Sequence, residues 1–561
     1  MICHICKKEF RSKKNELICG GCKEICYLYT SISNAEGEWK ETLRIETELW
    51  KGSRFFVEEL ISNVEKGIGV IEQAKQILED IKSQIIEHLK FYNKDDVIVA
   101  LMLIKEFVRR MTIKGNIDWK LINEYYLAIK LTEFVINIPP TEFCGASIGE
   151  LESGYSNFIS AISLGRVYLI LDENIKNSRF LNEKFLDIYK MTFEFIEIGD
   201  LEKYYDEYLM MGLDEKPEDY EIQNELLRYK LSQENKTPEK RKKFIDIFIE
   251  REFGFTLNNL DLLSKLIVLD EFKNKDEFKR YINSELIFNP SAPQLTIVNK
   301  KVLRENINTC IDESEFDAII NTFSINKFAS SKDNRNKKAL ELMSVYETEE
   351  LIIVGRLDFF QNVSSFEKFA NSGHYIEMFK EGINTNKCLS SQQKLSSYLA
   401  YVIADKLINN GYKLPMEKLS LEIGKGFVPR AEINKIQVDG ENILKQVGDL
   451  DVLAIDEKEK IIYIIELKNY KPAIDSKSLF FNDKNKIEDD EVFRKMKARE
   501  SVIKNNISSV VNFIIGESED DYKVKSIFVT ARPNYYACAK EENIEYITWS
   551  SLIKRIEGKE L

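Results

Sequence analysis

The stretch VGDLDVLAIDEKEKIIYIIELKN, residues 447–469, decides the fold of the C-terminal third of this chain. Two apolar runs flank the polar segment DEKEK, which is the pattern of two β-strands joined by a tight turn. If Asp456 pairs with Ile461, four residues form the turn and the strands run antiparallel. The pattern therefore predicts a β-hairpin with charged residues at its open end.

The register of this hairpin brings those charged residues together. Asp451 comes to lie opposite Glu466, and Asp449 opposite Lys468. Side chains on one face repeat every two residues, so all four are expected to project from the same face. Burying a lone carboxylate is costly unless a partner or a metal compensates it. Two facing carboxylates suit Mg²⁺ or Mn²⁺, and a lysine beside them can orient a water molecule or offset charge in a transition state.

Context distinguishes this Glu-x-Lys tripeptide from others in the chain. EWK and EFK also occur, but only Glu466 and Lys468 follow five strand-forming apolar residues, Ile461 to Ile465. Only they have a GxxD, Gly448–Asp451, with its aspartate fifteen residues before the glutamate. Together these elements resemble the PD-(D/E)XK nuclease superfamily, whose motif is an aspartate at the start of one strand and a (D/E)xK on the next.

The flanking segments extend the resemblance to the Mrr-like, restriction-endonuclease-like branch. Residues 390–414 resemble its opening helix and glycine turn, and residues 491–515 its second helix. Residues 523–531 resemble the next strand, and residues 532–556 a helix, strand and helix. The resemblance covers residues 391–561 and implies an α/β domain with a mixed sheet. It also implies a magnesium-dependent DNA endonuclease, as in restriction or anti-phage defence.

The resemblance assigns roles to individual residues. The family often has a glutamate on its opening helix, whereas the corresponding region near Ala400 has none, and Gln393 is a weak substitute. This absence puts a second metal site in doubt. The implied set comprises the Mg²⁺ ligands Asp451, Glu466 and the carbonyl of Leu467, the catalytic lysine Lys468, and the secondary acid Asp449.

The first 30 residues carry a separate pattern of paired cysteines. Two CxxC pairs are separated by twelve residues, which is typical of a structural zinc knuckle of the ribbon or treble-clef kind. Free thiols are the competing interpretation, and Cys26 could replace one ligand. Six basic and three acidic residues in the first 26 give a charge of +3, which leaves phosphate contact and a purely structural role both open. The expected zinc ligands are Cys3, Cys6, Cys19 and Cys22.

The middle of the chain is expected to be helical. Apolar residues recur every three or four positions from Phe56 to Ile85, which predicts a long helical hairpin or coiled coil over residues 36–120. The same period in shorter pieces predicts an all-α domain over residues 121–325, followed by a connecting region over residues 340–390. This helical part could bind a protein partner or a second copy of the chain.

Composition constrains the partners. The net charge is −13, so any nucleic-acid contact must be local. No apolar run approaches the roughly 20 residues that span a bilayer, and no secretory leader opens the chain. We therefore expect a cytoplasmic protein with no membrane partner. A basic group on the helix after the hairpin could follow a phosphate backbone, although a solvated helix face explains it equally well: Arg494, Lys495, Lys497 and Arg499.

Different classes of function fit these patterns. The leading hypothesis is a metal-dependent endonuclease. A helical scaffold or sensor that binds nucleic acid through a degenerate nuclease domain is the alternative, and a zinc-centred protein-interaction module is a third. The catalytic motif reports phosphate chemistry and not base recognition, so it does not separate DNA from RNA.

Overall fold

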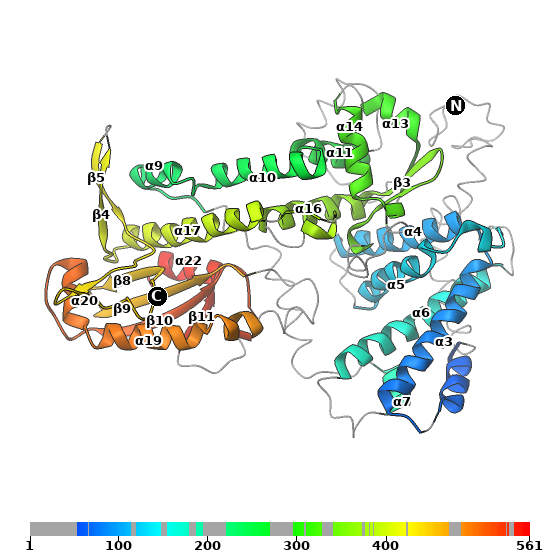
Figure 1. Ribbon diagram of the computed structural model, residues 1–561, viewed down its shortest axis with the longest axis horizontal. Coiled ribbons are helices and arrows are strands. Elements are labelled where there is room, and N and C mark those ends of the chain that lie inside the picture. The colour runs from blue at the N-terminus through cyan, green and yellow to red at the C-terminus, as the bar shows by residue number, and fades with distance from the viewer. Residues whose placement is uncertain are drawn as a thin grey trace. The chain divides into compact units, whose positions relative to one another are not determined.

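The computed structural model shows a mostly helical chain with a mixed sheet in its C-terminal part (Figure 1). No described helix has an apolar stretch long enough to cross a bilayer. Unit 1 comprises residues 1–198, 249–369 and 375–383, and unit 2 comprises residues 199–248, 370–374 and 384–561. The structure describes residues 53–65, 67–113, 119–146, 154–178, 187–194, 220–269, 295–307, 310–327, 340–372, 376–380, 382–384, 386–421, 424–470, 484–534, 536–537 and 544–561.

The helices of unit 1 pair both with sequence neighbours and with distant partners. Helix α3 (Val70–Lys90) packs along α6 (Gly154–Asn177) and against the short α7 (Ile188–Phe193), while α4 (Lys94–Ile113) packs along α5 (Trp119–Ile136) (Figure 1). Within the expected hairpin or coiled coil of residues 36–120, α3 thus packs mainly on α6, from outside that range, which covers the apolar stripe of α3. That stripe has the helical spacing of three and four: Ala74, Ile77, Leu78, Ile81, Ile85 and Leu89.

Unit 1 also contains a small antiparallel sheet. Its order is β1 (Leu295–Asn299), β3 (Leu351–Gly355) and β2 (Val345–Glu347). Every described side chain of β3 is buried, so this strand forms the centre of the sheet. The expectation of an all-α domain over residues 121–325 is therefore wrong at β1. Residues 340–390 likewise contain two strands of a folded unit and are more than a connection.

Further helices of unit 1 flank this sheet in sequence. Helices α11 (Leu257–Leu269) and α14 (Glu313–Thr322) lie in the chain on either side of β1, and α13 (Lys300–Ile307) follows β1 without an intervening loop. Helix α16 (Arg356–Ser372) begins directly after β3. The start of α16 therefore lies against the sheet.

A buried ionic group joins α4 to the start of α16. The carboxylate of Glu106 accepts the N–H groups of Leu357 at 2.7 Å and Asp358 at 3.0 Å. The Lys105 ammonium pairs with Asp358 at 2.7 Å, and the Tyr125 hydroxyl donates to Asp358 at 2.9 Å. Glu106 thus satisfies N–H groups that the first turn of a helix leaves without partners.

Unit 2 is built around a four-stranded mixed sheet. Its order is β11 (Glu545–Thr548), β10 (Lys523–Thr530), β9 (Ile461–Lys468) and β8 (Val452–Asp456). Strands β8 and β9 are antiparallel, and the remaining neighbours are parallel. The coarse expectation of a helical chain with a C-terminal α/β part containing a mixed sheet is confirmed.

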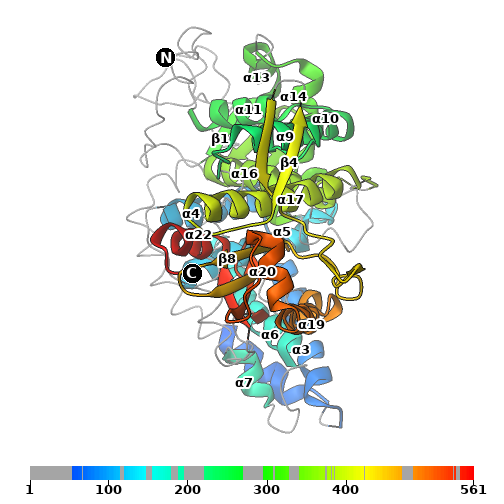
Figure 2. The ribbon, with the colours of Figure 1, turned by 90° about the vertical axis from the view of Figure 1, so that its left-hand side faces the viewer.

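Helices cover both faces of this sheet. Helices α17 (Asn386–Asn409) and α22 (Trp549–Gly558) pack on one face. Helices α19 (Val492–Lys504) and α20 (Ile507–Ile515) pack on the other. Figures 1 and 2 both show α17 and α19 on opposite sides of the strands. The sheet is therefore buried on both sides, which explains why β9 is an almost continuous apolar run.

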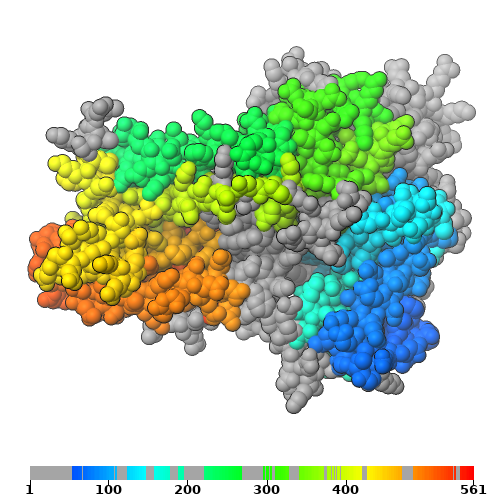
Figure 3. All heavy atoms as spheres, viewed as in Figure 1, coloured from blue at the N-terminus to red at the C-terminus, as the bar shows by residue number. Residues whose placement is uncertain are grey.

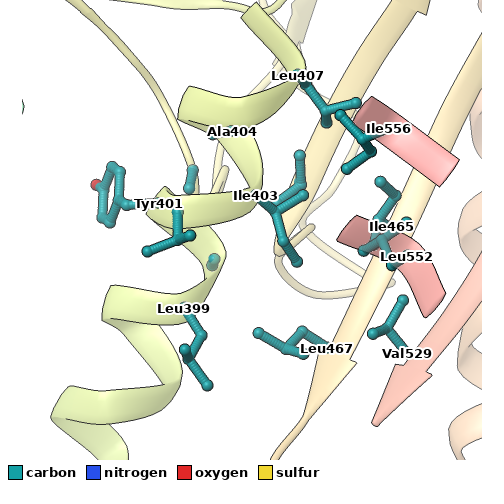
Figure 4. Close-up of a cluster of buried hydrophobic side chains, with 14 of the residues drawn as sticks. Leu399, Tyr401, Ile403, Ala404, Leu407, Ile465, Leu467, Val529, Leu552 and Ile556 are labelled. Carbon is teal, nitrogen blue, oxygen red and sulfur yellow. The ribbon is translucent and has the colours of Figure 1, made fainter. Parts of the chain in front are cut away.

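The alternation of side chains along β9 decides which helices each residue meets. Tyr463, Ile465 and Leu467 belong to the core on the α17 and α22 side, and Figure 4 shows Leu467 on the side of Leu399 from α17 and Ile465 beside Leu552 from α22. Ile462 and Ile464 belong to the core on the α19 and α20 side. Even-numbered residues of β9 thus face α19.

A segment from far earlier in the sequence completes the first of these cores. Helix α9 (Glu225–Gln233) precedes α10 (Pro238–Phe253). Ile222, Leu227 and Leu231 belong to the same apolar cluster as the buried residues of α17. The expected domain of residues 391–561 is therefore too short, because unit 2 also includes residues 199–248.

The sheet edge beside β8 is an interrupted strand. Lys413 pairs with Ile455 and Ile433 with Leu450, so the chain returns to the edge after an excursion between these bridges. The hairpin of β4 (Met416–Leu421) and β5 (Gly424–Pro429) fills this excursion, and the small hairpin of β6 (Gln437–Val438) and β7 (Glu441–Asn442) follows.

Candidate active site

The charged residues of the opening stretch lie where β8 and β9 stop pairing. The ladder runs from the pair Asp456–Ile461 to the pair Val452–Ile465, in the register expected from the sequence. One residue beyond this last pair, Asp451 and Glu466 follow on their two strands. The end of the hairpin therefore carries one acid from each strand.

The chain before β8 turns to a different partner. Leu450 N donates to Ile433 O at 2.9 Å, and Ile433 N donates to Leu450 O at 2.7 Å. Asp449 lies beyond this bridge and is exposed. The expectation that Asp449 faces Lys468 across the ladder is therefore wrong, because the β8–β9 ladder ends at the pair Val452–Ile465 and Leu450 pairs with Ile433.

Asp451 accepts a hydrogen bond from the backbone of β9. Its Oδ2 lies 2.7 Å from Leu467 N. Lys468 O accepts from Ala531 N at 2.9 Å on the β10 side. Backbone groups of successive strand residues point to alternate sides, so the carbonyl of Leu467 points to the side of Asp451. The carboxylate of Asp451 and this carbonyl therefore place two oxygen atoms that could coordinate a metal ion on the same side of β9.

Glu466 lies on the α19 side of the sheet, as the alternation along β9 requires. Only 4% of the residue is exposed. Its Oε1 lies 2.6 Å from the ammonium of Lys468, whose side chain is 32% exposed. Its Oε2 pairs with the guanidinium of Arg499 on α19. Both oxygens of the glutamate therefore have cationic partners.

Arg499 is the residue of this site whose role the sequence reading missed. It is 8% exposed, and its Nε donates to the carbonyl of Val447 at 3.0 Å. The expectation that it lines an exposed phosphate path is therefore wrong. A signal was present, because α19 buries residues at helical spacing and Arg499 falls on that stripe: Val492, Met496, Arg499 and Ile503.

Gly448 allows the guanidinium to approach the turn before β8. Its φ is +80°, a conformation that residues with a Cβ seldom adopt. A Cβ at this position would lie 3.3 Å from a terminal nitrogen of Arg499. The glycine of the GxxD therefore serves both the backbone turn and the buried arginine.

The site concentrates charge in a buried place. Burial, and then the negative charge of Glu466, raises the pKa of Asp451 to about 7. Burial alone would lower the pKa of Lys468, but the carboxylates of Glu466 and Asp451 outweigh it and raise that pKa. A cation held between the acids would favour the ionised form of Asp451.

The other residues predicted for the site lie apart from the two acids. Arg494, Lys495 and Lys497 are exposed on α19, and Arg494 pairs with Glu491. Figure 3 shows atoms of the segment of α19 and α20, coloured orange, at the surface in this view. Gln393 is exposed on α17. Of the four predicted basic residues, Arg494, Lys495 and Lys497 are therefore exposed and Arg499 is buried.

The donor set fits a hard divalent cation in part. In the residues that the structure describes, no group of three or more His, Cys, Asp and Glu side chains could hold a metal ion. Asp451, Glu466 and the carbonyl of Leu467 supply oxygen donors, which Mg²⁺ and Mn²⁺ prefer, and Mg²⁺ usually keeps several water ligands. The expected zinc ligands Cys3, Cys6, Cys19 and Cys22 lie outside the described residues.

Comparisons of the chain with family models, curated proteins and solved structures gave no match.

Proposed function

We propose that unit 2 is a divalent-metal-dependent nuclease of the PD-(D/E)XK type that hydrolyses phosphodiester bonds in DNA. The observation that carries the proposal is the convergence of Asp451, Glu466 and Lys468 at one end of two neighbouring strands. An aspartate on one strand and Glu-x-Lys on the next, with the register that makes them meet, is the arrangement of that superfamily's motif.

Each residue has a role in this proposal. Asp451, Glu466 and the carbonyl of Leu467 would hold Mg²⁺ or Mn²⁺. The cation would polarise the scissile phosphate and lower the pKa of a bound water. Lys468 would orient the attacking water or balance the negative charge that develops on the phosphate. Its side chain is 32% exposed, so its ammonium can leave Glu466 toward solvent while Arg499 still compensates the buried carboxylate.

The pairing of Glu466 favours a second candidate function. Lys468 and Arg499 occupy both of its oxygens, as a degenerate site without a cation would also require. In that case, the chain is a helical scaffold or sensor that binds nucleic acid through unit 2 without cutting it.

The wider setting follows from the proposed chemistry. We propose a cytoplasmic enzyme of restriction or anti-phage defence, in which Cys3, Cys6, Cys19 and Cys22 hold a structural Zn²⁺. Unit 1 would contact a protein partner or a second copy of the chain. Arg494, Lys495 and Lys497 would contact the DNA backbone.

Cleavage assays test the nuclease directly. We expect the purified protein to cut DNA with Mg²⁺ or Mn²⁺ and not with EDTA. Asp451→Asn keeps an oxygen that can accept the Leu467 N–H but loses the charge, so it should lower the rate roughly 100-fold or more while the sheet remains folded. Lys468→Met should cause a loss of similar size. Duplex DNA, single-stranded DNA and RNA should be compared as substrates.

Asp449→Asn is the matched control, because this aspartate is exposed and two residues away. It should cut at the wild-type rate. Wild-type protein that cuts no nucleic acid, or an Asp451→Asn variant that cuts as fast as wild type, would refute the proposal. Binding of nucleic acid without cleavage would support the scaffold instead.

A further inference from the structure

We propose that Arg499 is a positioning residue that holds Glu466 through Oε2 and keeps Oε1 as the oxygen available to a divalent cation. The inference rests on the proposed function, and it explains how a glutamate with two cationic partners can still act as a ligand. In this proposal, Lys468 leaves Glu466 when the cation binds, and Arg499 keeps its ion pair with Glu466.

The two partners of Glu466 differ in burial. The Arg499 side chain is 9% exposed, whereas that of Lys468 is 32% exposed. Moving Arg499 away would leave a buried guanidinium without its carboxylate partner and leave Glu466 with Lys468 alone, which is strongly unfavourable. Moving Lys468 away from Glu466 brings one ammonium toward solvent, while Glu466 keeps its ion pair with Arg499. The bond to Lys468 is therefore the weaker restraint on Glu466.

Arg499 also has a second anchor. Its Nε donates to the carbonyl of Val447, while another nitrogen of the same guanidinium pairs with Glu466. The planar guanidinium can bond two acceptors at once in a fixed geometry. One side chain of α19 thus joins β9 to the turn Val447–Gly448, which leads directly into Asp451.

This connection sets the positions of the two acids relative to each other. Asp451 is fixed from one side by the N–H of Leu467 and from the other by the turn that Arg499 holds. Glu466 is fixed by the same guanidinium. Residues that orient metal ligands in this way contribute substantially to metal affinity.

A simple charge effect makes the opposite prediction. If Arg499 acted only as a positive charge, a lysine at this position would replace it fully, and a neutral residue would strengthen cation binding by removing a repulsion. If Arg499 positions Glu466, a lysine is inadequate, because one ammonium cannot reproduce the two-point fork. Arg499→Lys therefore separates the two roles.

The test measures Mn²⁺ binding by electron paramagnetic resonance in the full chain, alongside cleavage. We expect Arg499→Lys to weaken Mn²⁺ binding roughly 10-fold to 100-fold and to lower kcat. Hydrogen exchange at Gly448 and Leu467 should become faster. Arg555→Lys is the matched control, because Arg555 lies on α22, on the opposite face of the sheet, where it pairs with Glu545; it should change neither quantity.

A measurement on wild-type protein avoids any folding defect of the variant. With isotope-labelled arginine, the Nε–H signal of Arg499 should remain protected from exchange with water when Mg²⁺ is added. Loss of that protection on metal binding would overturn the inference, as would wild-type Mn²⁺ affinity in a folded Arg499→Lys variant.

The outcomes keep this inference distinct from the proposed function. Cleavage that depends on Asp451 and Lys468 but not on Arg499 would refute the inference alone. Arg499-dependent Mn²⁺ binding without any cleavage would refute the nuclease and leave the inference standing. A wild-type protein that binds no Mn²⁺ would refute both.

Discussion

At the scale of single residues, Gly448 tests how closely the turn and the buried arginine fit. We expect Gly448→Ala to destabilise the protein by roughly 1–2 kcal/mol from its left-handed backbone, and by a further amount because the added Cβ crowds Arg499. Gly440→Ala is the control, since its φ is +86° with nothing within 4 Å of a Cβ. Chemical unfolding measures the difference. Equal losses in the two variants would show that Arg499 is not crowded.

The candidate site was partly predictable at this scale. Asp451 and Glu466 follow from strand pairing, because a period of two and a four-residue turn fix the register. Asp449 could not be placed, since the next residue, Leu450, pairs with Ile433, a partner that no local sequence pattern indicates. Arg499 was predicted to be exposed because charged side chains usually are, although its position falls on the buried stripe of α19. A buried arginine needs an acid opposite it, and Glu466 is far away in sequence.

At the scale of elements, α4 holds the start of α16 through Glu106. Burial raises the pKa of Glu106 to about 8, although the N–H groups of Asp358 and Leu357 lower it. The folded state thus binds this proton at pH values where the unfolded chain has released it. Stability from this group is therefore fully present below the ordinary value of 4.5 and is lost as the pH rises through about 8.

Hydrogen exchange can detect this dependence. The free energy of opening at Leu357 and Asp358, corrected for the intrinsic exchange rate, should fall by a few kcal/mol between about pH 5 and pH 8. Glu106→Gln should flatten the dependence while lowering protection overall, because an amide NH₂ would face a backbone N–H. A wild-type opening energy that stays constant over this range would contradict the raised pKa.

At the scale of the whole molecule, α9 is a required part of unit 2. A fragment of residues 384–561 would leave uncovered the core that Ile222, Leu227 and Leu231 fill. We expect it to bind a hydrophobic dye and to unfold at lower denaturant concentration than the same unit in the full chain. A peptide of residues 220–248 should reverse both effects, and the same peptide with Leu227→Asp should not. A fragment that is equally stable without the peptide would contradict this role.

Domain composition was the least predictable feature of the chain. Helices and strands follow from local periodicity, so α3, α17 and the β8–β9 hairpin were expected close to where they lie. The pairing of α3 with α6 and the placement of α9 in unit 2 depend on contacts between segments distant in sequence, which periodicity does not specify. Strand β1 escaped notice because five residues carry too short a pattern to stand out from a helical background.

The hydrogen bond between Asp451 and the backbone of Leu467 affects how homologous sequences should be interpreted. The carboxylate occupies the place of a strand partner, so a homologue that had lost its chemistry would still be under selection to keep an acceptor there. Retention of aspartate at that position is then a poor marker of an active family member. The recorded partner of the Lys468 ammonium is a side chain, that of Glu466, and not the backbone. Replacement of this lysine would therefore mark a pseudoenzyme more clearly than replacement of Asp451.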